Sequence, residues 1–259
     1  MTGRHIVITG AARGIGAAIA HLLAADGHRL TLLGRRLDAL QALAASLPPP
    51  AEGREGRHHC VVADVADEAQ VQAAFDSARA ALGPVWGLVN NAGQAQSAPL
   101  HRTSAELWQR MLAVNLTGSF LCCRAALADL RAGGQGRIVN IASTAGQRGY
   151  AYVAAYSAAK HGVVGLTRSM ALELAASGVT VNAVCPGYTE TDLLRDSVAN
   201  VVAQTGRTPE QARAEFAASN PQRRLVQPEQ VADAVRWLLG AGASAITGQC
   251  ISVSGGEVM

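Results

Sequence analysis

Residues 9–16, with the sequence TGAARGIG, decide the fold. They follow a short β-branched run at residues 5–9, which is typical of a buried strand, and they lead into an alanine-rich stretch of helical period at residues 15–26. Glycines at such a junction permit a sharp turn and a close approach of the backbone to a phosphate, while the helix N-terminus offers free N–H groups. The segment therefore predicts a strand, a phosphate-binding turn and a helix. A plain glycine turn is the simpler alternative.

Short apolar runs alternate with helical patterns along the rest of the chain. This alternation is typical of βαβ units, and it predicts one doubly wound, Rossmann-like α/β domain over residues 1–259, with a seven-stranded parallel sheet flanked by helices. The predicted strands are residues 5–9, 29–33, 59–63, 87–90, 137–142, 180–185 and 250–253. The predicted helices are residues 15–26, 69–82, 105–130, 154–177 and 228–239.

Two segments interrupt this pattern. Residues 48–57 are rich in Pro, Glu, Gly and Arg and predict an exposed loop before the third strand, without a domain boundary. Residues 187–226 carry weak helical signals and begin just past a strand end, where open α/β sheets bind their ligands. We therefore expect residues 187–226 to form a lid over the substrate.

The composition excludes several classes of protein. With 49% hydrophobic and 16% charged residues, the 259-residue chain is expected to fold into a globular domain. No uninterrupted apolar run approaches the roughly 18 residues of a membrane-spanning helix, and the N-terminus lacks a signal-peptide pattern. The 22 basic and 19 acidic residues are mixed along the chain, which argues against binding to nucleic acid or membranes. We expect a cytoplasmic protein.

The cysteines and histidines do not predict a metal site. The five cysteines are scattered without a CxxC pair, and we interpret them as reduced core thiols. His58 and His59 precede Cys60, but neighbouring side chains on a strand point to opposite faces and no further ligand cluster is evident. We expect no bound metal.

Lys160 is the only lysine in the chain and follows Tyr156 by four residues in a predicted helix. This spacing places both side chains on one helix face. A phenol titrates near 10 in water, and a neighbouring ammonium favours the phenolate. The pair therefore predicts a tyrosine with a lowered pKa that can donate and accept a proton; ordinary half-buried packing of the tyrosine is the alternative.

Two further polar residues fit this site. Ser143 follows the fifth predicted strand, and its hydroxyl is expected at the same sheet edge, where it would hold a substrate oxygen. Asn115 lies in a mostly apolar stretch, where a buried amide needs a partner or a water. The simpler alternatives are that Ser143 caps a turn and that Asn115 bonds a helix carbonyl.

Together these residues resemble one family. The ordered motifs TGxxxGxG, Asn-Asn-Ala-Gly, Asn, Ser, Tyr-x-x-x-Lys and Pro-Gly are similar to those of short-chain dehydrogenases/reductases, from Ile6 to Gly256. The resemblance implies hydride transfer between a nicotinamide cofactor and a carbonyl or secondary alcohol. It also implies the roles of the catalytic residues: proton transfer by Tyr156, lowering of its pKa and binding of the ribose by Lys160, stabilisation of the substrate oxygen by Ser143, and support of a relay water by Asn115.

The cofactor is expected to be NADP, with NAD as the alternative. The second strand ends without the acidic residue that holds the ribose of NAD, whereas Arg35 and Arg13 can bind a 2′-phosphate. Asp64, after the third strand, is a candidate partner for the adenine amino group, although an Asx turn explains it equally well. The residues expected to hold the cofactor are Thr9, Gly10, Arg13, Gly14, Ile15, Gly16, Arg35, Asp64, Asn91, Gly93, Tyr156, Lys160, Pro186, Gly187 and Thr191.

The expected substrate is a ketone. Residues 156–188 are most similar to reductases of 3-oxoacyl thioesters and to polyketide ketoreductases, so a 3-oxoacyl thioester or a similar medium-sized, partly apolar ketone is predicted. Arg195, Arg223 and Arg224 are candidates for binding a carrier phosphate or are solvated charges. The expected pocket residues are Gln94, Tyr150, Tyr152, Val153, Tyr188, Leu193 and Leu194.

Other assignments remain open at this stage. An NAD-dependent secondary alcohol dehydrogenase of the same family is one alternative, and a non-catalytic sensor of nicotinamide redox state is another. A sugar epimerase of related fold would require a larger C-terminal domain. Family resemblance also predicts a homotetramer, with the apolar stripe of the last helix and strand, including Trp237 and Ile251, at an interface.

Overall fold

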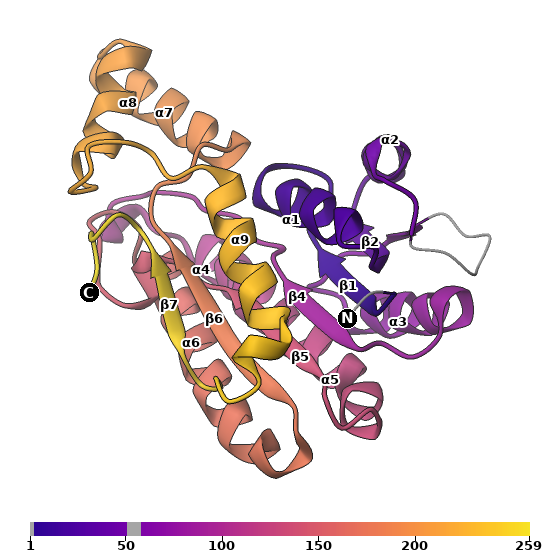
Figure 1. Ribbon diagram of the computed structural model, residues 1–259. Helices are drawn as coiled ribbons and strands as arrows, with labels where there is room; N and C mark the ends of the chain where they lie inside the picture. The colour runs from indigo at the N-terminus through magenta and orange to yellow at the C-terminus, as the bar shows by residue number, and fades with distance from the viewer. Residues whose placement is uncertain (1–2, 51–57) are drawn as a thin grey trace.

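The computed structural model describes residues 3–50 and 58–259. In this part of the chain one parallel sheet has seven strands, as predicted (Figure 1). Their order in the sheet is β3-β2-β1-β4-β5-β6-β7. Residues 51–57 of the predicted loop lie outside the described residues. The strands are β1 (His5–Thr9), β2 (Arg29–Gly34), β3 (His59–Val62), β4 (Gly87–Asn90), β5 (Arg137–Ile141), β6 (Thr180–Pro186) and β7 (Cys250–Val253).

Helices cover both faces of the sheet, which is why most strands are continuous apolar runs. Side chains alternate along β1, so that Ile6 and Ile8 face one core and Val7 faces the other. The first core lies under α1 (Gly14–Ala25), α2 (Leu37–Ser46) and α9 (Pro228–Leu239). The second lies under α3 (Glu68–Leu82), α5 (Gly118–Ala132) and α6 (Ala154–Leu174).

The helices differ from the prediction at three places. Helix α2 was not predicted, because its buried side is formed by Leu40 and Leu43 alone, while its third leucine, Leu37, is exposed. The single helix expected at residues 105–130 contains a π turn, Ala113–Thr117, between α4 (Ala105–Leu112) and α5. The predicted lid segment contains two well-formed helices, α7 (Asp192–Thr205) and α8 (Pro209–Ala218).

The composite helix Ala105–Ala132 is long and apolar enough to cross a membrane by length and composition alone. In the fold it belongs to the core: Leu121, Cys122 and Leu130 are buried against the sheet layer, and α5 packs against α3. Its apolar composition is therefore explained by packing within the domain.

The topology determines where a ligand site can form. All seven strands described are parallel, so their carboxyl ends lie at one edge of the sheet. The chain order reverses between β1 and β4, which leaves a crevice at that edge. Helices α7 and α8 lie above the edge near the C-terminus (Figure 1).

Candidate active site

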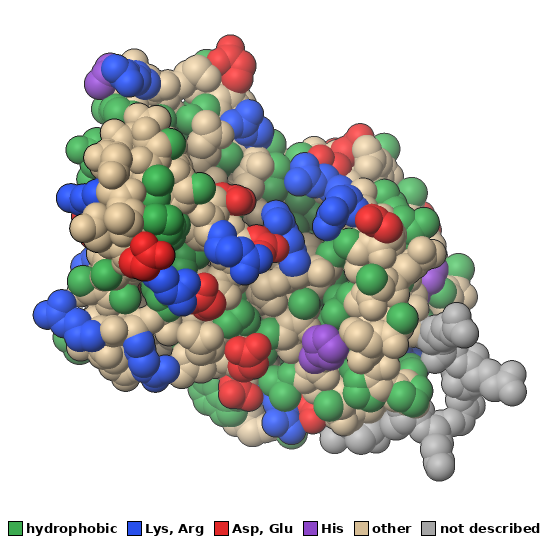
Figure 2. Space-filling view, turned by 90° about the horizontal axis from the view of Figure 1, so that it is seen from above, with side chains coloured by type: hydrophobic (Ala, Val, Ile, Leu, Met, Phe, Trp, Pro, Cys, Tyr) green, Lys and Arg blue, Asp and Glu red, His purple; other side chains and the backbone are tan. Residues whose placement is uncertain are grey.

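A cleft of about 1260 Å³ opens at the carboxyl edge of the sheet. It runs from the turn after β1 and the end of β2, past the ends of β4 and β5, to the segment after β6 and to α7. Seen from above this edge, basic side chains gather around the hollow between the α7–α8 lobe and the rest of the molecule (Figure 2). The cleft is large enough for a dinucleotide together with a small substrate.

The turn after β1 has the geometry of a phosphate-binding loop. Gly10 and Gly14 adopt left-handed φ values of +62° and +55°, which disfavour any residue with a Cβ. A Cβ on Gly16 would lie 2.3 Å from the carbonyl oxygen of Gly10. Helix α1 begins at Gly14 with no side-chain cap, so its first N–H groups are available to an anion.

Thr9 and Asn91 brace this turn. The Thr9 hydroxyl accepts hydrogen bonds from the N–H groups of Asn91 and Ala92, both at 3.0 Å. The Asn91 amide donates to the carbonyl oxygens of Thr9 and Gly10, also at 3.0 Å. Thr9 is buried and, like Gly16, does not line the cleft. These two predicted cofactor residues therefore support the shape of the loop, whereas Asn91 also lines the cleft.

The end of the cleft beside β2 is basic. Arg35 and Arg36 are exposed and line the cleft just past the end of β2, and no acidic side chain stands beside them in the sequence before Asp38. Arg13 also lines the cleft and forms an ion pair with Asp192 at 3.3 Å, between the phosphate loop and α7. Excess positive charge at this end suits a phosphate-bearing ligand.

Asp64 follows β3 and lines the cleft. Its Oδ1 accepts a hydrogen bond from the N–H of Ala66 at 3.0 Å. The Asx turn considered as the simpler explanation is therefore present, and it holds the carboxylate at the cleft wall.

Tyr156 and Lys160 lie in the first two turns of α6, and both line the cleft. The Lys160 Nζ atom is 5.7 Å from the centroid of the Tyr156 ring. It donates a hydrogen bond to the carbonyl oxygen of Ile141, at the end of β5, at 2.8 Å. The helical spacing thus brings the phenol and the ammonium together at the sheet edge, as predicted.

The predicted lowering of the Tyr156 pKa is wrong for this structure. Burial raises the pKa of Tyr156 to about 12, and a hydrogen bond with the Ser143 hydroxyl opposes the shift without cancelling it. Burial also lowers the pKa of Lys160 to about 8. Desolvation is the largest cause of the raised Tyr156 pKa, because removing a phenolate from water disfavours the charged form.

Ser143 sits where β5 leads into a 3-10 turn, Thr144–Gly146. Its Oγ accepts a hydrogen bond from the N–H of Ala145 at 3.1 Å, so the turn-capping alternative holds. Its hydroxyl also faces the cleft and reaches Tyr156. A serine that is fixed by its own turn and touches the phenol can orient a substrate oxygen.

Asn115 lies in the π turn and is completely buried. Its Nδ2 donates to the carbonyl oxygens of Gln94 and Met111, both at 2.9 Å, and its Oδ1 accepts from the N–H of Gln94 at 3.2 Å. The alternative of a bond to a helix carbonyl is thus present. A Cβ on Gly93 would lie 2.9 Å from the Asn115 Oδ1 and 3.7 Å from the Lys160 Nζ, so the amide and the ammonium flank the same glycine.

The other half of the cleft is largely apolar and aromatic. Pro186, Gly187 and Thr191 line the cleft in the segment after β6, where the resemblance places the residues beside the reactive end of a cofactor. Arg195, Arg223 and Arg224 do not line the cleft, and Arg195 instead forms an ion pair with Asp192. The predicted pocket residues that do line the cleft are Gln94, Tyr150, Tyr152, Val153, Tyr188, Leu193 and Leu194.

Several cleft residues were not predicted from the sequence. Phe216 comes from α8, and Arg102 comes from a 3-10 turn that carried no recognisable pattern. Arg148 lies in the loop between Ser143 and Tyr156, and its charge between these two site residues is the signal in the sequence that indicates it.

No metal-binding cluster of three or more His, Cys, Asp or Glu side chains is found in residues 3–50 and 58–259. His58 bonds the carbonyl oxygen of Pro48 at 2.9 Å, and His59 bonds the Ser77 hydroxyl at 2.9 Å. Each histidine therefore has a structural partner.

Comparison with known proteins gives the family. The family model for short chain dehydrogenases matches residues 4–202. The cis-4-hydroxycyclohexanecarboxylate dehydrogenase of Sinomonas cyclohexanicum is 42% identical over 98% of this chain and 96% of its own length. Levodione reductase of Leifsonia aquatica is 35% identical over 99% of this chain and 94% of its own. Further relatives from Streptomyces carry the name ketoacyl reductase.

A solved structure extends the similarity to three dimensions. Actinorhodin polyketide ketoreductase, as a variant crystallised with NADPH, has a TM-score of 0.91 and 36% identity, and covers 98% of this chain and 97% of its own. The chain belongs to the short-chain dehydrogenase/reductase family. It is an NAD(P)-dependent oxidoreductase that acts on CH–OH and C=O groups, which sets aside the non-catalytic sensor considered from the sequence.

Proposed function

We propose that the protein is an NADPH-dependent ketoreductase whose substrate is a 3-oxoacyl thioester or a similar medium-sized, partly apolar ketone. The observation that carries the proposal is the meeting of Ser143, Tyr156 and Lys160 in one cleft that has a basic end and an apolar, aromatic end. The similarity to a ketoreductase crystallised with NADPH supports it.

The residues present fit the cofactor. The glycine loop and the uncapped N-terminus of α1 would receive the pyrophosphate, and Arg35 with Arg13 would receive a 2′-phosphate. Lys160 would hold the nicotinamide ribose, next to Gly93. When bound, the cofactor supplies the hydride that is added to the carbonyl carbon.

The protein's own residues supply the proton and the orientation. The Ser143 hydroxyl donates a hydrogen bond to the substrate carbonyl oxygen, on which negative charge develops during the reduction. The Tyr156 hydroxyl gives its proton to that oxygen, and the resulting phenolate is stabilised by the Lys160 ammonium and is reprotonated from solvent. Because burial keeps Tyr156 protonated, it is in the proton-donating form at neutral pH.

Asn115 has a supporting part in the proposed proton transfer. Its side chain anchors the Gln94 backbone to the π turn beside Lys160. A π turn is a frequent marker of functional sites within helices. We assign to Asn115 the role of holding a water at the inner end of the proton path.

Helices α7 and α8 would act as a lid. Asn200 of α7 donates a hydrogen bond to the Ser97 hydroxyl across the cleft mouth at 2.8 Å, and the ion pair of Arg13 with Asp192 bridges the other side. Both contacts are exposed or half-exposed and are readily broken. Opening of this lid would admit the carbonyl substrate.

The oligomer proposed from the sequence is a homotetramer. Trp237 on α9 is 46% exposed, and β7 forms one edge of the sheet. Exposed apolar side chains beside a free strand edge favour association of subunits. Light scattering at micromolar concentration is expected to give the mass of a tetramer, and the mass of a monomer would contradict this.

The substrate class is tested by a panel of carbonyls. Purified protein with NADPH is mixed in turn with acetoacetyl thioesters, simple ketones and sugars, and NADPH absorbance is followed. We expect the thioesters and medium-sized ketones to be reduced faster than sugars. Failure on every thioester would dispose of the preferred substrate class.

A second candidate is an NAD-dependent secondary alcohol dehydrogenase. The similarity to a relative named as a dehydrogenase of a hydroxylated cyclohexane ring favours it. Formation of NADH from NAD and cyclohexanol, faster than consumption of NADPH with ketones, would support this candidate over the first.

A further inference from the structure

The carboxylate of Glu257, near the C-terminus, is buried behind the apolar, aromatic half of the cleft. Its side chain is only 1% exposed. Its Oε1 accepts hydrogen bonds from the Tyr150 hydroxyl at 2.7 Å and from the Arg148 guanidinium at 3.2 Å. Its Oε2 has no hydrogen-bond partner within residues 3–50 and 58–259, and it lies against Gly187. The buried charge is thus held by two side chains that line the cleft.

Tyr150 is fixed from several sides by this arrangement. Its hydroxyl also contacts the Thr144 hydroxyl at 2.8 Å, and Thr144 directly follows Ser143. The Arg148 guanidinium lies over the ring, 4.5 Å from its centroid. Burial raises the pKa of Tyr150 to about 12, so its hydroxyl remains a donor to the carboxylate at neutral pH.

A second contact ties the C-terminal segment to the same loop. The Ser252 hydroxyl of β7 donates a hydrogen bond to the Gln147 side chain at 2.9 Å. The loop between Ser143 and α6 is therefore attached to the C-terminal segment twice, through the bond of Gln147 with Ser252 and through the bonds of Arg148 and Tyr150 with Glu257. Neither contact involves Ser143, Tyr156 or Lys160.

Tyr150 is the first member of what we name the aromatic wall, formed by Tyr150, Tyr188 and Phe216. The rings of Tyr150 and Tyr188 meet edge to face, with centroids 6.3 Å apart and an interplanar angle of 78°. The Tyr188 and Phe216 centroids are 4.7 Å apart. All three residues line the cleft, and Phe216 comes from the proposed lid. The aromatic wall thus connects the loop between Ser143 and α6 to helix α8.

We propose that Glu257 is a positioning residue that fixes the aromatic wall, and that the wall selects ring-shaped ketones over small open-chain ketones. This inference rests on the proposed ketoreductase function. A six-membered ring covers more of an aromatic surface than a short chain does, and binding free energy increases with the apolar area removed from water. If Tyr150 loses its carboxylate anchor, the ring-shaped substrate loses more contact than the small one.

The test compares two neutral ketones, cyclohexanone and 2-butanone, with NADPH. Glu257→Gln keeps the shape but presents an amide to Arg148, and Tyr150→Phe removes the anchored hydroxyl. In both variants we expect kcat/KM for cyclohexanone to fall about ten-fold and that for 2-butanone by less than about three-fold, with the KM for NADPH unchanged. The double variant is expected to resemble either single variant, because both remove the same interaction.

Asp129→Asn is the matched control. Asp129 is also a largely buried carboxylate bonded to an arginine, but it lies far from the cleft, beside the amino end of β4. The Asp129→Asn substitution is expected to lower the melting temperature without changing the ratio of the two kcat/KM values. A parallel loss for both ketones in Glu257→Gln, or an unchanged ratio, would overturn the inference.

Amide hydrogen exchange does not depend on catalytic activity, so it tests the role of Glu257 separately from the proposed function. If the wild-type protein reduces neither ketone, the two ketones are not substrates, and amide hydrogen exchange then tests the role of Glu257. Glu257→Gln is expected to speed exchange in residues 143–152 and to leave residues 79–85 unchanged. Unchanged exchange in residues 143–152 would show that Glu257 does not position the loop.

Discussion

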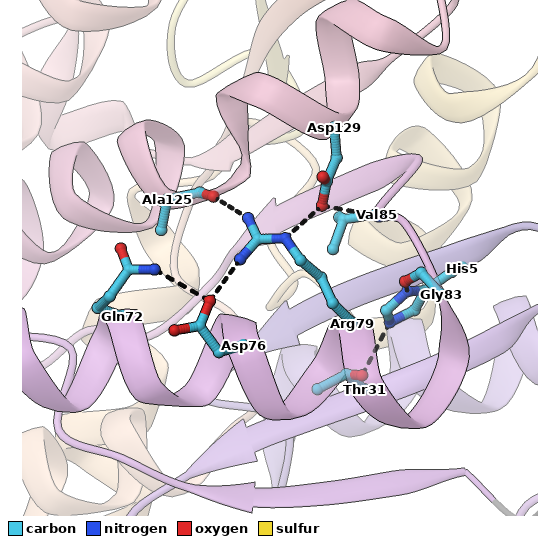
Figure 3. A network of polar contacts seen from close by, with 9 residues as sticks. All are labelled: His5, Thr31, Gln72, Asp76, Arg79, Gly83, Val85, Ala125 and Asp129. Carbon is cyan, nitrogen blue, oxygen red and sulfur yellow. Dashed lines mark hydrogen bonds and ion pairs between the residues drawn. The ribbon is translucent and has the colours of Figure 1, made fainter.

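The polar side chains at the two edges of the sheet are arranged differently: at the amino edge they bond one another, and at the carboxyl edge they face a cleft. At the amino edge, shown in Figure 3, the Arg79 guanidinium bonds Asp129 at 2.8 Å, Asp76 at 2.9 Å and the carbonyl oxygen of Ala125. Beside it, His5 bonds the carbonyl oxygen of Gly83 at 2.7 Å and the Thr31 hydroxyl at 2.9 Å. These groups are directed at one another and leave little capacity for a ligand.

At the carboxyl edge the polar groups are directed at a cleft. The buried Lys160 ammonium has three N–H donors, and within residues 3–50 and 58–259 it has one hydrogen-bond acceptor, the carbonyl oxygen of Ile141. Tyr156 and Ser143 contact each other beside the same open space. The difference indicates that the amino-edge network serves stability and that the carboxyl-edge groups serve binding and catalysis. Substitutions at the two edges should therefore separate activity from stability.

The largest effect is expected for Tyr156→Phe. Loss of the phenol hydroxyl beside Ser143, which is the proposed proton donor, should lower kcat by about 1,000-fold. The KM for NADPH and the melting temperature should change little, because the ring is retained. Steady-state kinetics with the best ketone of the panel check this, and a kcat near that of the wild type would refute the assignment of Tyr156.

At the opposite edge, Asp129→Ala should act on stability alone. It leaves the partly buried Arg79 without its shorter carboxylate contact and removes the acceptor of the Val85 N–H. Removal of one partner from a largely buried pair costs about 3 kcal/mol of unfolding free energy. Urea unfolding measures this loss, and kcat should stay within about two-fold of the wild type. A selective loss of kcat would contradict the separation of the two edges.

Because of His5, the protein is expected to become less stable toward unfolding at acidic pH. Burial lowers the pKa of His5 to about 4, from 6.5, so the unfolded chain takes up the proton first as the pH falls. The contribution of the neutral His5 to the free energy of unfolding is therefore complete above pH 6.5, and it decreases by up to about 3 kcal/mol as the pH approaches 4. Unfolding curves from pH 7 to pH 4 should show a smaller loss for His5→Gln. Equal slopes in both proteins would contradict this role of His5.

Much of this division between the edges could be predicted from the sequence. Parallel strands must bring their carboxyl ends to one edge, so Ser143 after the fifth strand and Tyr156 on the following helix were expected to meet. The raised pKa of Tyr156 was not predictable, because spacing reveals a neighbouring charge but not how far the phenol is removed from water. The contact of Glu257 with Tyr150 joins residues 107 positions apart, and no local pattern indicates it.

Arg35→Asp should produce the smallest effect, confined to the choice of cofactor. The substitution replaces an exposed cation at the cleft with an anion that repels a 2′-phosphate. The ratio of kcat/KM for NADPH to that for NADH should fall by about ten-fold or more, with kcat for the ketone retained. A preference of the wild-type protein for NADH would defeat the assignment of NADP.

The most direct test of the division between the edges is a crystal structure of the protein with NADPH. We expect the 2′-phosphate beside Arg35, the pyrophosphate on the glycine loop at the start of α1, and the nicotinamide ring between Lys160 and Gly187. Both Tyr156 and Ser143 should face the ring across a space that fits a carbonyl group. A nucleotide bound outside this cleft, or with its nicotinamide turned away from Tyr156, would contradict the account.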